Sequence, residues 1–322
     1  MGCDWCPRGC GANRAGGERG VCGAPAEMRV ARAALHFWEE PPLSGERGSG
    51  AIFFTHCPLR CAYCQNAVIA HGEAGRAVTV DDVAAMMCSL VRQGALNINC
   101  VTPTHYAPGV REAVRRARAA GMDVPVVWNT SGYETVSAVR DNAGVVDVYL
   151  TDFKYASASL ASAYSHAPDY PRVALAALDA MVDVVGDAAY DEVDGQPRML
   201  RGIVVRHLLL PGAVEDSLAV VRLLHERYGS HVRLSLMNQY TPVLAQAAAE
   251  GDERARRVLE RFPELGRRVP DADYERVLDF ADDLGVEDYF WQDGPAAEES
   301  FIPPFDLTGV EPAAAAADTP AF

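Results

Sequence analysis

Nine cysteines supply most of the side chains in this sequence that can bind a metal or undergo redox chemistry. Seven of them lie in two tight clusters near the N-terminus, and the other two are Cys88 and Cys100. An odd number of closely spaced cysteines, with no secretory signal before them, does not suggest a disulfide framework. We therefore expect metal or redox chemistry in a reducing cytoplasm, with Cys88 and Cys100 as small buried apolar residues.

The second cluster consists of Cys57, Cys61 and Cys64, with the spacing C-x3-C-x2-C. Three thiolates this close together can bind three irons of a [4Fe–4S] cluster and leave the fourth iron open, because such clusters usually take four cysteines. The alternatives are three buried cysteines or structural zinc, but zinc takes four ligands and no nearby histidine is spaced well, although His56 adjoins Cys57. Tyr63 precedes the last cysteine and offers an aromatic face to a bound cofactor.

The first cluster lies within residues 1–50, a stretch that is rich in Gly, Arg and Cys and has little apolar periodicity. This composition predicts a small segment that is folded around a metal rather than around a hydrophobic core. Four thiolates suit a second [4Fe–4S] cluster or structural zinc equally well, and the absence of any metal is the third alternative. The four cysteines are Cys3, Cys6, Cys10 and Cys22.

Lys154 is the only lysine in the chain, and every other cationic side chain is arginine. A compact ammonium in that background is a candidate for a role that guanidinium cannot fill, such as binding a ligand carboxylate. Asp152 lies two residues before it, and Arg206 either binds a ligand in the same way or forms a buried ion pair. We expect further ligand contacts from polar residues near the ends of predicted strands: Thr102, Thr104, His105, Asn129, Thr130, Asn238 and Gln239.

Strands and helices alternate through the middle of the chain. Strands are predicted at 51–54, 97–101, 124–128, 147–150, 200–210 and 231–236, with helices between them. Such alternation implies parallel strands joined by right-handed crossovers, in either a barrel or an open doubly wound sheet. A charged helical region follows, and residues 306–322 form a low-complexity tail that we expect to be disordered.

The cysteine triplet resembles the C-x3-C-x-aromatic-C loop of the radical S-adenosylmethionine (SAM) superfamily. Other phrases resemble its branch similar to pyruvate formate-lyase-activating enzyme, including Asn99–His105, Asn129–Tyr133, Leu150–Lys154 and Leu236–Gln239. The resemblance implies an α/β fold with a partial (β/α)6 barrel over residues 51–305 and a [4Fe–4S] cluster on Cys57, Cys61 and Cys64. It also implies S-adenosyl-L-methionine as cofactor, with Asp152 and Lys154 near methionine and substrate. The Gly-Gly-Glu-Pro segment of many relatives is replaced by Val101–His105, where Thr hydroxyls and carbonyls can take its place.

The function expected from this resemblance is reductive cleavage of SAM to a 5′-deoxyadenosyl radical, which abstracts hydrogen from a substrate. Reduced flavodoxin or ferredoxin would supply the electron, and the substrate would be the glycine of a glycyl-radical enzyme. Alternatives are another peptide or small-molecule substrate, or a non-catalytic iron–sulfur electron carrier or metal-binding protein. A net charge of −15 argues against nucleic acid as a partner, and no apolar run is long enough to span a membrane.

Overall fold

A computed structural model describes residues 2–292 and 302–310, and one large sheet organises the chain. Seven strands run parallel in the order β2, β4, β5, β6, β8, β9 and β10, and each strand pairs with the next. Their bounds are Ser49–Phe54, Ile98–Val101, Val126–Thr130, Val148–Asp152, Gln196–Leu208, Arg233–Met237 and Phe290–Trp291.

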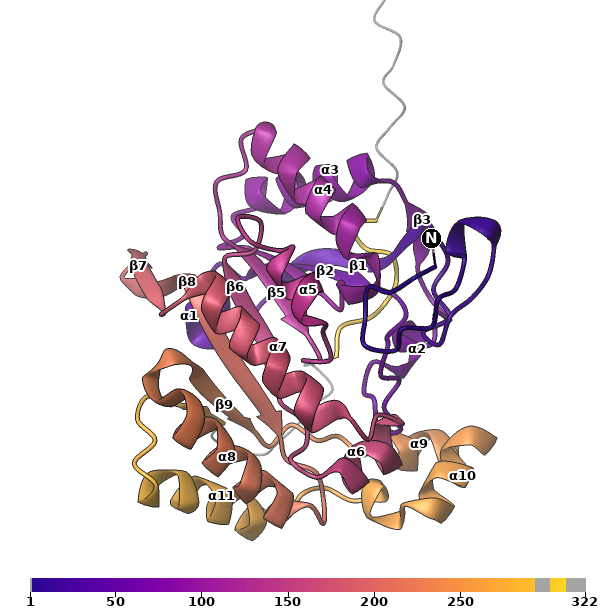
Figure 1. The fold of residues 1–322 in the computed structure, drawn as a ribbon, viewed down its shortest axis with the longest axis vertical. Coiled ribbons are helices and arrows are strands. Elements are labelled where there is room, and N and C mark those ends of the chain that lie inside the picture. The colour runs from indigo at the N-terminus through magenta and orange to yellow at the C-terminus, as the bar shows by residue number, and fades with distance from the viewer. Residues whose placement is uncertain (1, 293–301, 311–322) are drawn as a thin grey trace, which may run out of the picture.

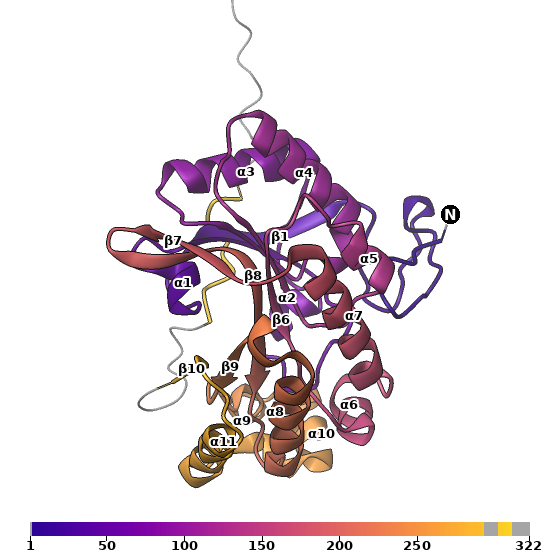
Figure 2. The same ribbon diagram turned by 60° about the vertical axis from the view of Figure 1, so that its left-hand side comes forward.

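This strand order decides between a barrel and an open doubly wound sheet, the two architectures that alternating strands and helices predict. Each parallel strand is the spatial neighbour of the one before it, so the chain winds in one direction and its helices follow one another around the outer side of the sheet (Figure 1 and Figure 2). A doubly wound sheet would reverse its order at a switch point, whereas here the sheet curves into a partial barrel. The predicted partial (β/α)6 barrel is confirmed.

Three long helices cover the outer side along much of the sheet: α3 (Val80–Arg92), α4 (Ala107–Ala119) and α7 (Tyr170–Val185). Thr79 begins α3 with a capping box, in which its hydroxyl accepts from the Asp82 amide and the Asp82 carboxylate accepts from the Thr79 amide. The remaining helices are α1 (Pro41–Ser44), α2 (Ala67–Ala70), α5 (Val136–Arg140), α6 (Ala158–Ser165), α8 (Val214–Tyr228), α9 (Val243–Ala249), α10 (Glu253–Arg261) and α11 (Asp271–Asp283). Within the described residues, none of these helices is both long and apolar enough to cross a membrane.

Register decides which side chains face the interior of the barrel. Ile52, Cys100, Trp128 and Tyr149 are successive partners across four strands, and all are buried in the core that the sheet shares with the helices. The neighbouring row contains Asn129, which lines the interior. On the inner side, Leu43 of α1 packs on Val127 and Val148 and closes the barrel floor. The open end of the interior is therefore left at the carboxyl ends of the strands.

Two antiparallel features were not predicted from the sequence. Strand β1 (Met28–His36) pairs with β2 and with β3 (Arg76–Val78), so residues 28–36 belong to the barrel sheet. The boundary predicted after residue 50 falls inside β2, although a division into folding units stays a prediction. Strand β7 (Ala189–Val193) forms a hairpin with β8, where the sequence predicted no strand before residue 200.

Residues 302–310 form a strap along β1, which corrects the expectation that the chain is disordered from residue 306. The Leu307 amide donates to the Ala31 carbonyl at 3.1 Å, and the Ala33 amide donates to the Thr308 carbonyl at 2.8 Å. Val310 is 1% exposed. Composition alone suggested a tail. It does not show that backbone amide and carbonyl groups of β1 are available to form hydrogen bonds with residues 302–310. The remainder of the predicted tail, 311–322, lies outside the described residues.

Candidate functional site

A cavity of about 350 Å³ opens at the carboxyl ends of the parallel strands. Its volume lies within the range of about 300–1,000 Å³ that is usual for small-molecule sites. Active sites of β/α barrels form at this end because the loops after every strand converge there. The cavity brings together eleven residues predicted from sequence: Cys57, Cys61, Tyr63, Cys64, Thr102, Asn129, Thr130, Asp152, Lys154, Arg206 and Gln239.

The three cysteines lie on the loop between β2 and α2. The loop turns sharply, with φ of +70° at His56 and +53° at Arg60. It is fixed to the rest of the barrel mouth at two points: the Ala62 amide donates to the Tyr164 carbonyl at 2.7 Å, and Gln65 Nε2 donates to the Gln239 carbonyl at 2.6 Å. The loop is thus held against both α6 and the segment after β9.

The three thiols lie near one another: Cys61 is buried, and Cys57 and Cys64 are half-buried. Burial, with the nearby thiols, raises the pKa of Cys57 to about 11 and that of Cys64 to about 12. Without a metal these two thiols are therefore protonated, and a bound cation would draw them into the thiolate form. Within residues 2–292 and 302–310, no three His, Cys, Asp or Glu side chains lie close enough together to hold a single metal ion.

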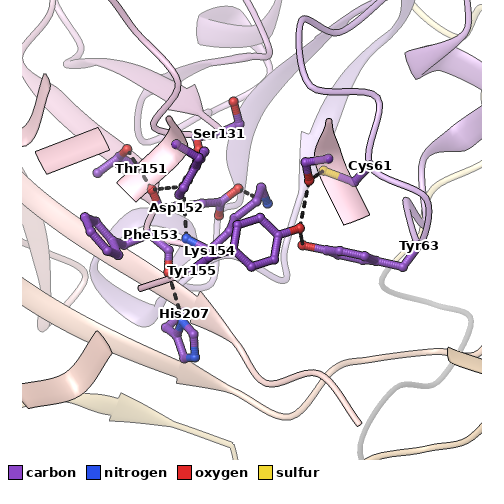
Figure 3. A network of polar contacts seen from close by, with 11 residues as sticks. Cys61, Tyr63, Ser131, Thr151, Asp152, Phe153, Lys154, Tyr155 and His207 are labelled. Atoms are coloured by element: carbon purple, nitrogen blue, oxygen red, sulfur yellow. Dashed lines mark hydrogen bonds and ion pairs between the residues drawn. The ribbon is translucent and has the colours of Figure 1, made fainter. Parts of the chain in front are cut away.

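A chain of hydroxyl groups leads to the sulfur of Cys61. Ser165 Oγ, at the end of α6, donates to Cys61 Sγ at 3.0 Å and lies 2.7 Å from the Tyr155 hydroxyl. The Tyr155 hydroxyl also lies 2.8 Å from the hydroxyl of Tyr63, as Figure 3 shows. Tyr63, expected from sequence to cover a cofactor, is 4% exposed, and its ring packs edge-on against Tyr164 and Tyr240.

Lys154 and Asp152 form an ion pair in the wall of the cavity (Figure 3). Lys154 Nζ lies 2.6 Å from Asp152 Oδ2, and the Lys154 amide donates to the hydroxyl of Tyr170 at 2.9 Å. Burial acts to lower the pKa of Lys154, but the Asp152 carboxylate and other nearby groups outweigh it and hold the pKa well above its usual value. The ammonium is therefore charged and held at one position.

Arg206 is buried and forms the ion pair that was one of its two predicted roles. Its guanidinium donates to Glu40 Oε1 at 2.8 Å and Oε2 at 2.6 Å, and also to the Glu39 carboxylate. Both glutamates line the cavity, precede α1 and were missed by the sequence analysis. The register pairs Asp152 with Arg206 and Arg206 with Ser235, which places all three in one row across the barrel mouth.

Three residues predicted to contact a ligand do not line the cavity: Thr104, His105 and Asn238. The Thr104 hydroxyl donates to Glu134 Oε1 at 2.6 Å, and Thr130, which does line the cavity, donates to the same oxygen at 2.7 Å. His105 is 1% exposed, with Nε2 2.7 Å from the Thr55 carbonyl. Asn238 is 5% exposed, and its backbone amide donates to Gln292 Oε1. Glu134 is a buried carboxylate whose pKa is raised by burial, and the sequence analysis did not single it out.

The N-terminal cysteines lie near one another beside the barrel. Burial, together with the charges of Cys22 and Cys3, raises the pKa of Cys6 to about 12. The pKa of Cys10 is lowered, chiefly because its sulfur accepts a hydrogen bond from the Ala12 amide. Amide hydrogen bonds to sulfur are also typical of metal-bound thiolates, where they stabilise the charge.

Two arginines attach this N-terminal segment to the barrel. Arg8 donates to the Pro58 carbonyl of the cysteine loop at 2.9 Å and to the Ser165 carbonyl at 2.8 Å. Arg14 is 6% exposed, donates to the carbonyls of Pro25 and His105, and lies over the rings of Trp5 and Tyr106. The segment 2–24 is therefore in direct contact with the loop that carries Cys57.

Comparison with known proteins yields one family match. Residues 43–162 match the model of a 4Fe-4S single cluster domain, a range that contains the Cys57–Cys64 loop and the Asp152–Lys154 pair. The chain is also 24% identical over 295 residues to an uncharacterized protein of Methanocaldococcus jannaschii. That alignment covers 88% of this chain and 75% of the relative.

Two solved structures show weaker likeness. A radical SAM methyltransferase from Sphaerobacter thermophilus aligns with a TM-score of 0.48 and 12% identity, over 76% of this chain and 65% of that one. An aldo/keto reductase from Brucella melitensis aligns with a TM-score of 0.22 and 11% identity, over 63% of this chain and 91% of that one. Neither TM-score is high enough to establish a shared fold, so neither structure supports an assignment of function.

Proposed function

We propose that this protein is a radical SAM enzyme, with a [4Fe–4S] cluster bound by Cys57, Cys61 and Cys64. The observation that carries the proposal is that these three thiols share a cavity with the Asp152–Lys154 pair, at the end of the barrel where loops converge. The match of residues 43–162 to a 4Fe-4S single cluster domain supports the nature of the cluster.

The donor set fits the proposed group. Three thiols on one loop, which all line the cavity, supply three iron ligands, and a fourth iron would be left for a ligand in the cavity. When bound there, reduced cluster and SAM supply a 5′-deoxyadenosyl radical that abstracts hydrogen from the substrate. The charged ammonium of Lys154 suits the carboxylate of the methionine group, and Asn129 suits the ribose hydroxyls. The buried walls exclude water from a reactive radical.

Product analysis tests this function. Purified protein, reconstituted with iron and sulfide under anaerobic conditions and reduced with dithionite, should convert SAM to 5′-deoxyadenosine and methionine. Cys61→Ala should abolish the product, because a cluster without one of its three cysteines is lost or loses its open iron. The matched control is Cys88→Ala, since Cys88 lies in α3 and does not line the cavity. Undiminished 5′-deoxyadenosine from Cys61→Ala would refute the assignment.

For the substrate, we propose the backbone glycine of a glycyl-radical enzyme, with reduced flavodoxin or ferredoxin as the electron donor. The support is the likeness of phrases such as Leu150–Lys154 to the activating-enzyme branch. Incubation with SAM, reductant and such an enzyme should produce the glycyl-radical doublet in its electron paramagnetic resonance (EPR) spectrum. SAM cleavage without that signal in any such partner would favour another peptide or a small molecule. No SAM cleavage at all would favour the non-catalytic electron carrier.

We also propose that Cys3, Cys6, Cys10 and Cys22 bind a second metal, and that the protein works in the reducing cytoplasm where such thiolates persist. Support comes from the influence that these thiols have on one another's pKa values and from the amide hydrogen bond to Cys10. Among the described residues no three of them lie close enough together for a single ion, so structural zinc would require this segment to rearrange. Iron and zinc analysis of the wild type and of Cys6→Ala identifies the metal. Loss of about four irons indicates a second [4Fe–4S] cluster, and loss of about one zinc indicates a structural site. Unchanged metal content would contradict the proposal.

A further inference from the structure

The hydroxyl groups of Tyr63, Tyr155 and Ser165 form a chain of polar contacts that ends on the sulfur of Cys61. Ser165 is 0% exposed, and its Oγ lies within hydrogen-bond distance of the Tyr155 hydroxyl at 2.7 Å and of Cys61 Sγ at 3.0 Å. A sulfur atom is a weak acceptor while it carries a proton, and a much better one as a thiolate. The arrangement therefore suits a charged Cys61 sulfur more than a neutral thiol.

The backbone around Ser165 is held from two sides. Arg8 donates to the carbonyls of Ser165 and His166, at 2.8 Å and 2.5 Å, and the same guanidinium donates to Pro58 in the cysteine loop. Next to Ser165, the Tyr164 carbonyl accepts from the Ala62 amide. The carbonyls of Tyr164, Ser165 and His166 thus connect the end of α6 to the cysteine loop, directly or through Arg8, and this keeps Ser165 Oγ in place beside Cys61.

The hydroxyls behind Ser165 make its orientation predictable. The Tyr155 hydroxyl, which is fully buried, donates to the Tyr63 hydroxyl at 2.8 Å and lies 2.7 Å from Ser165 Oγ. The proton of Tyr155 is therefore used, and the single proton of Ser165 can go either to the Tyr155 oxygen or to Cys61 Sγ. A thiolate is the stronger acceptor, so a charged Cys61 sulfur draws the Ser165 proton to itself. Figure 3 shows the Tyr155 and Tyr63 hydroxyls facing each other on the side of Cys61.

We propose that Ser165 is a positioning residue that sets the reduction potential of the cluster on Cys57, Cys61 and Cys64, with the Tyr155 oxygen as a competing acceptor of its proton. This inference rests on the proposed function, because it needs that cluster. A hydrogen bond to a ligand sulfur withdraws negative charge from the cluster and so favours the reduced form, which has gained one electron. Removing the donor should make the cluster harder to reduce.

The test is an EPR-monitored redox titration of the reconstituted protein with dithionite. Ser165→Ala should shift the midpoint potential to a more negative value, with no loss of iron. Tyr155→Phe keeps the ring and removes only the hydroxyl that competes for the Ser165 proton, so it should shift the potential in the opposite direction by a smaller amount. The matched control is Ser162→Ala on the same helix α6, whose side chain is exposed and which should titrate like the wild type.

The outcomes separate this inference from the function on which it rests. If the wild type and Ser165→Ala both hold the cluster and titrate at the same potential, the inference is wrong and the proposed function stands. If Ser165→Ala loses its cluster, Tyr155→Phe decides: a shift to a less negative potential supports the inference, and an unchanged or more negative potential overturns it. A wild type that binds no [4Fe–4S] cluster would overturn the proposed function and the inference together.

Discussion

Lys154 is the only ammonium-bearing side chain in the chain, and its environment now explains why arginine does not replace it. Nζ lies 2.6 Å from Asp152 in the cavity wall, where a wider planar guanidinium would have to displace neighbouring groups. We predict that Lys154→Arg weakens SAM binding by about tenfold, the effect of losing roughly 1.4 kcal/mol. Equilibrium binding of SAM to the reconstituted protein measures this directly.

The control for that substitution is the reverse exchange at a surface ion pair. Arg118 pairs with Asp147 at 2.7 Å outside the cavity, so Arg118→Lys should leave SAM affinity unchanged. Wild-type affinity and turnover in Lys154→Arg would remove Lys154 from the site.

Single residues also show where sequence reasoning about the site reaches its limit. Polar residues near strand ends were correctly expected at the barrel mouth, because parallel strands bring their carboxyl ends to one edge. Which of them face the cavity depends on partners that are distant in sequence. Thr104 follows β4 as predicted, but its hydroxyl donates to Glu134, thirty residues later. Glu39 and Glu40 were missed because they precede the first predicted strand, and their partner Arg206 lies far from them in the sequence.

At the scale of elements, Gly309 shows how closely the strap 302–310 lies on β1. Its φ is +70°, and a Cβ at this position would lie 1.9 Å from the Ala33 carbonyl oxygen, so no side chain fits unless the strap moves. We predict that Gly309→Ala lowers the free energy of unfolding by about 3 kcal/mol. This sum takes roughly 1 kcal/mol for the left-handed conformation and roughly 1 kcal/mol for each of the two strap–β1 backbone hydrogen bonds.

Gly144 provides a matched control for this prediction. Its φ is +71°, but nothing lies within 4 Å of the Cβ position. Gly144→Ala should therefore show only the conformational cost of roughly 1 kcal/mol. Denaturant titrations of both variants measure the difference. Equal losses of stability in the two variants would mean that the strap can move away from β1 without loss of free energy and does not stabilise the strand.

The elements that sequence reasoning found and missed differ in a physical way. The parallel strands were found because, being buried on both faces, they appear as continuous apolar runs such as Ile52–Phe54. Strand β1 was missed because its Arg29 and Arg32 interrupt the apolar pattern; these side chains reach Gly75 and Asp306, which no local pattern reveals. The hairpin of β7 and β8 did carry a signal, Asp194-Gly195, which is typical of a tight turn.

At the scale of the whole molecule, two fully buried histidines link stability to pH. His207 Nδ1 donates to the Phe153 carbonyl at 2.8 Å, which leaves Nε2 to accept from Ser217. Burial lowers the pKa of His207 from 6.5 to about 4 and that of His105 to about 3. Between pH 6.5 and 4 the unfolded chain therefore binds two protons that the folded chain does not. Stability should fall as the pH falls through that window, by about 1.4 kcal/mol per pH unit for each histidine.

Denaturant titrations at several pH values between 7.5 and 5 measure this slope. His207→Asn should be less stable at every pH, because it leaves a cavity and loses a hydrogen bond. Below pH 6.5, however, its free energy of unfolding should depend less steeply on pH, because the unfolded state now binds one extra proton fewer. The control is Leu224→Ala on α8, which leaves a cavity without removing a titratable group and should therefore lower stability while keeping the wild-type slope. A wild-type stability that does not change between pH 6.5 and 5 would show that these histidines do not remain neutral.

The contact between the strap and β1 also has a consequence for protein synthesis. Arg32 and its partner Pro304 are separated by 272 positions in the chain. Ribosomes add about 5–20 residues per second, so β1 emerges on the order of tens of seconds before the strap. During that interval the amide of Ala33 and the carbonyl of Ala31 have no strap to pair with, and a nascent chain exposes a strand edge of the kind that promotes aggregation. A ribosome stalled before codon 302 would hold the chain in that state, with the edge of β1 uncovered.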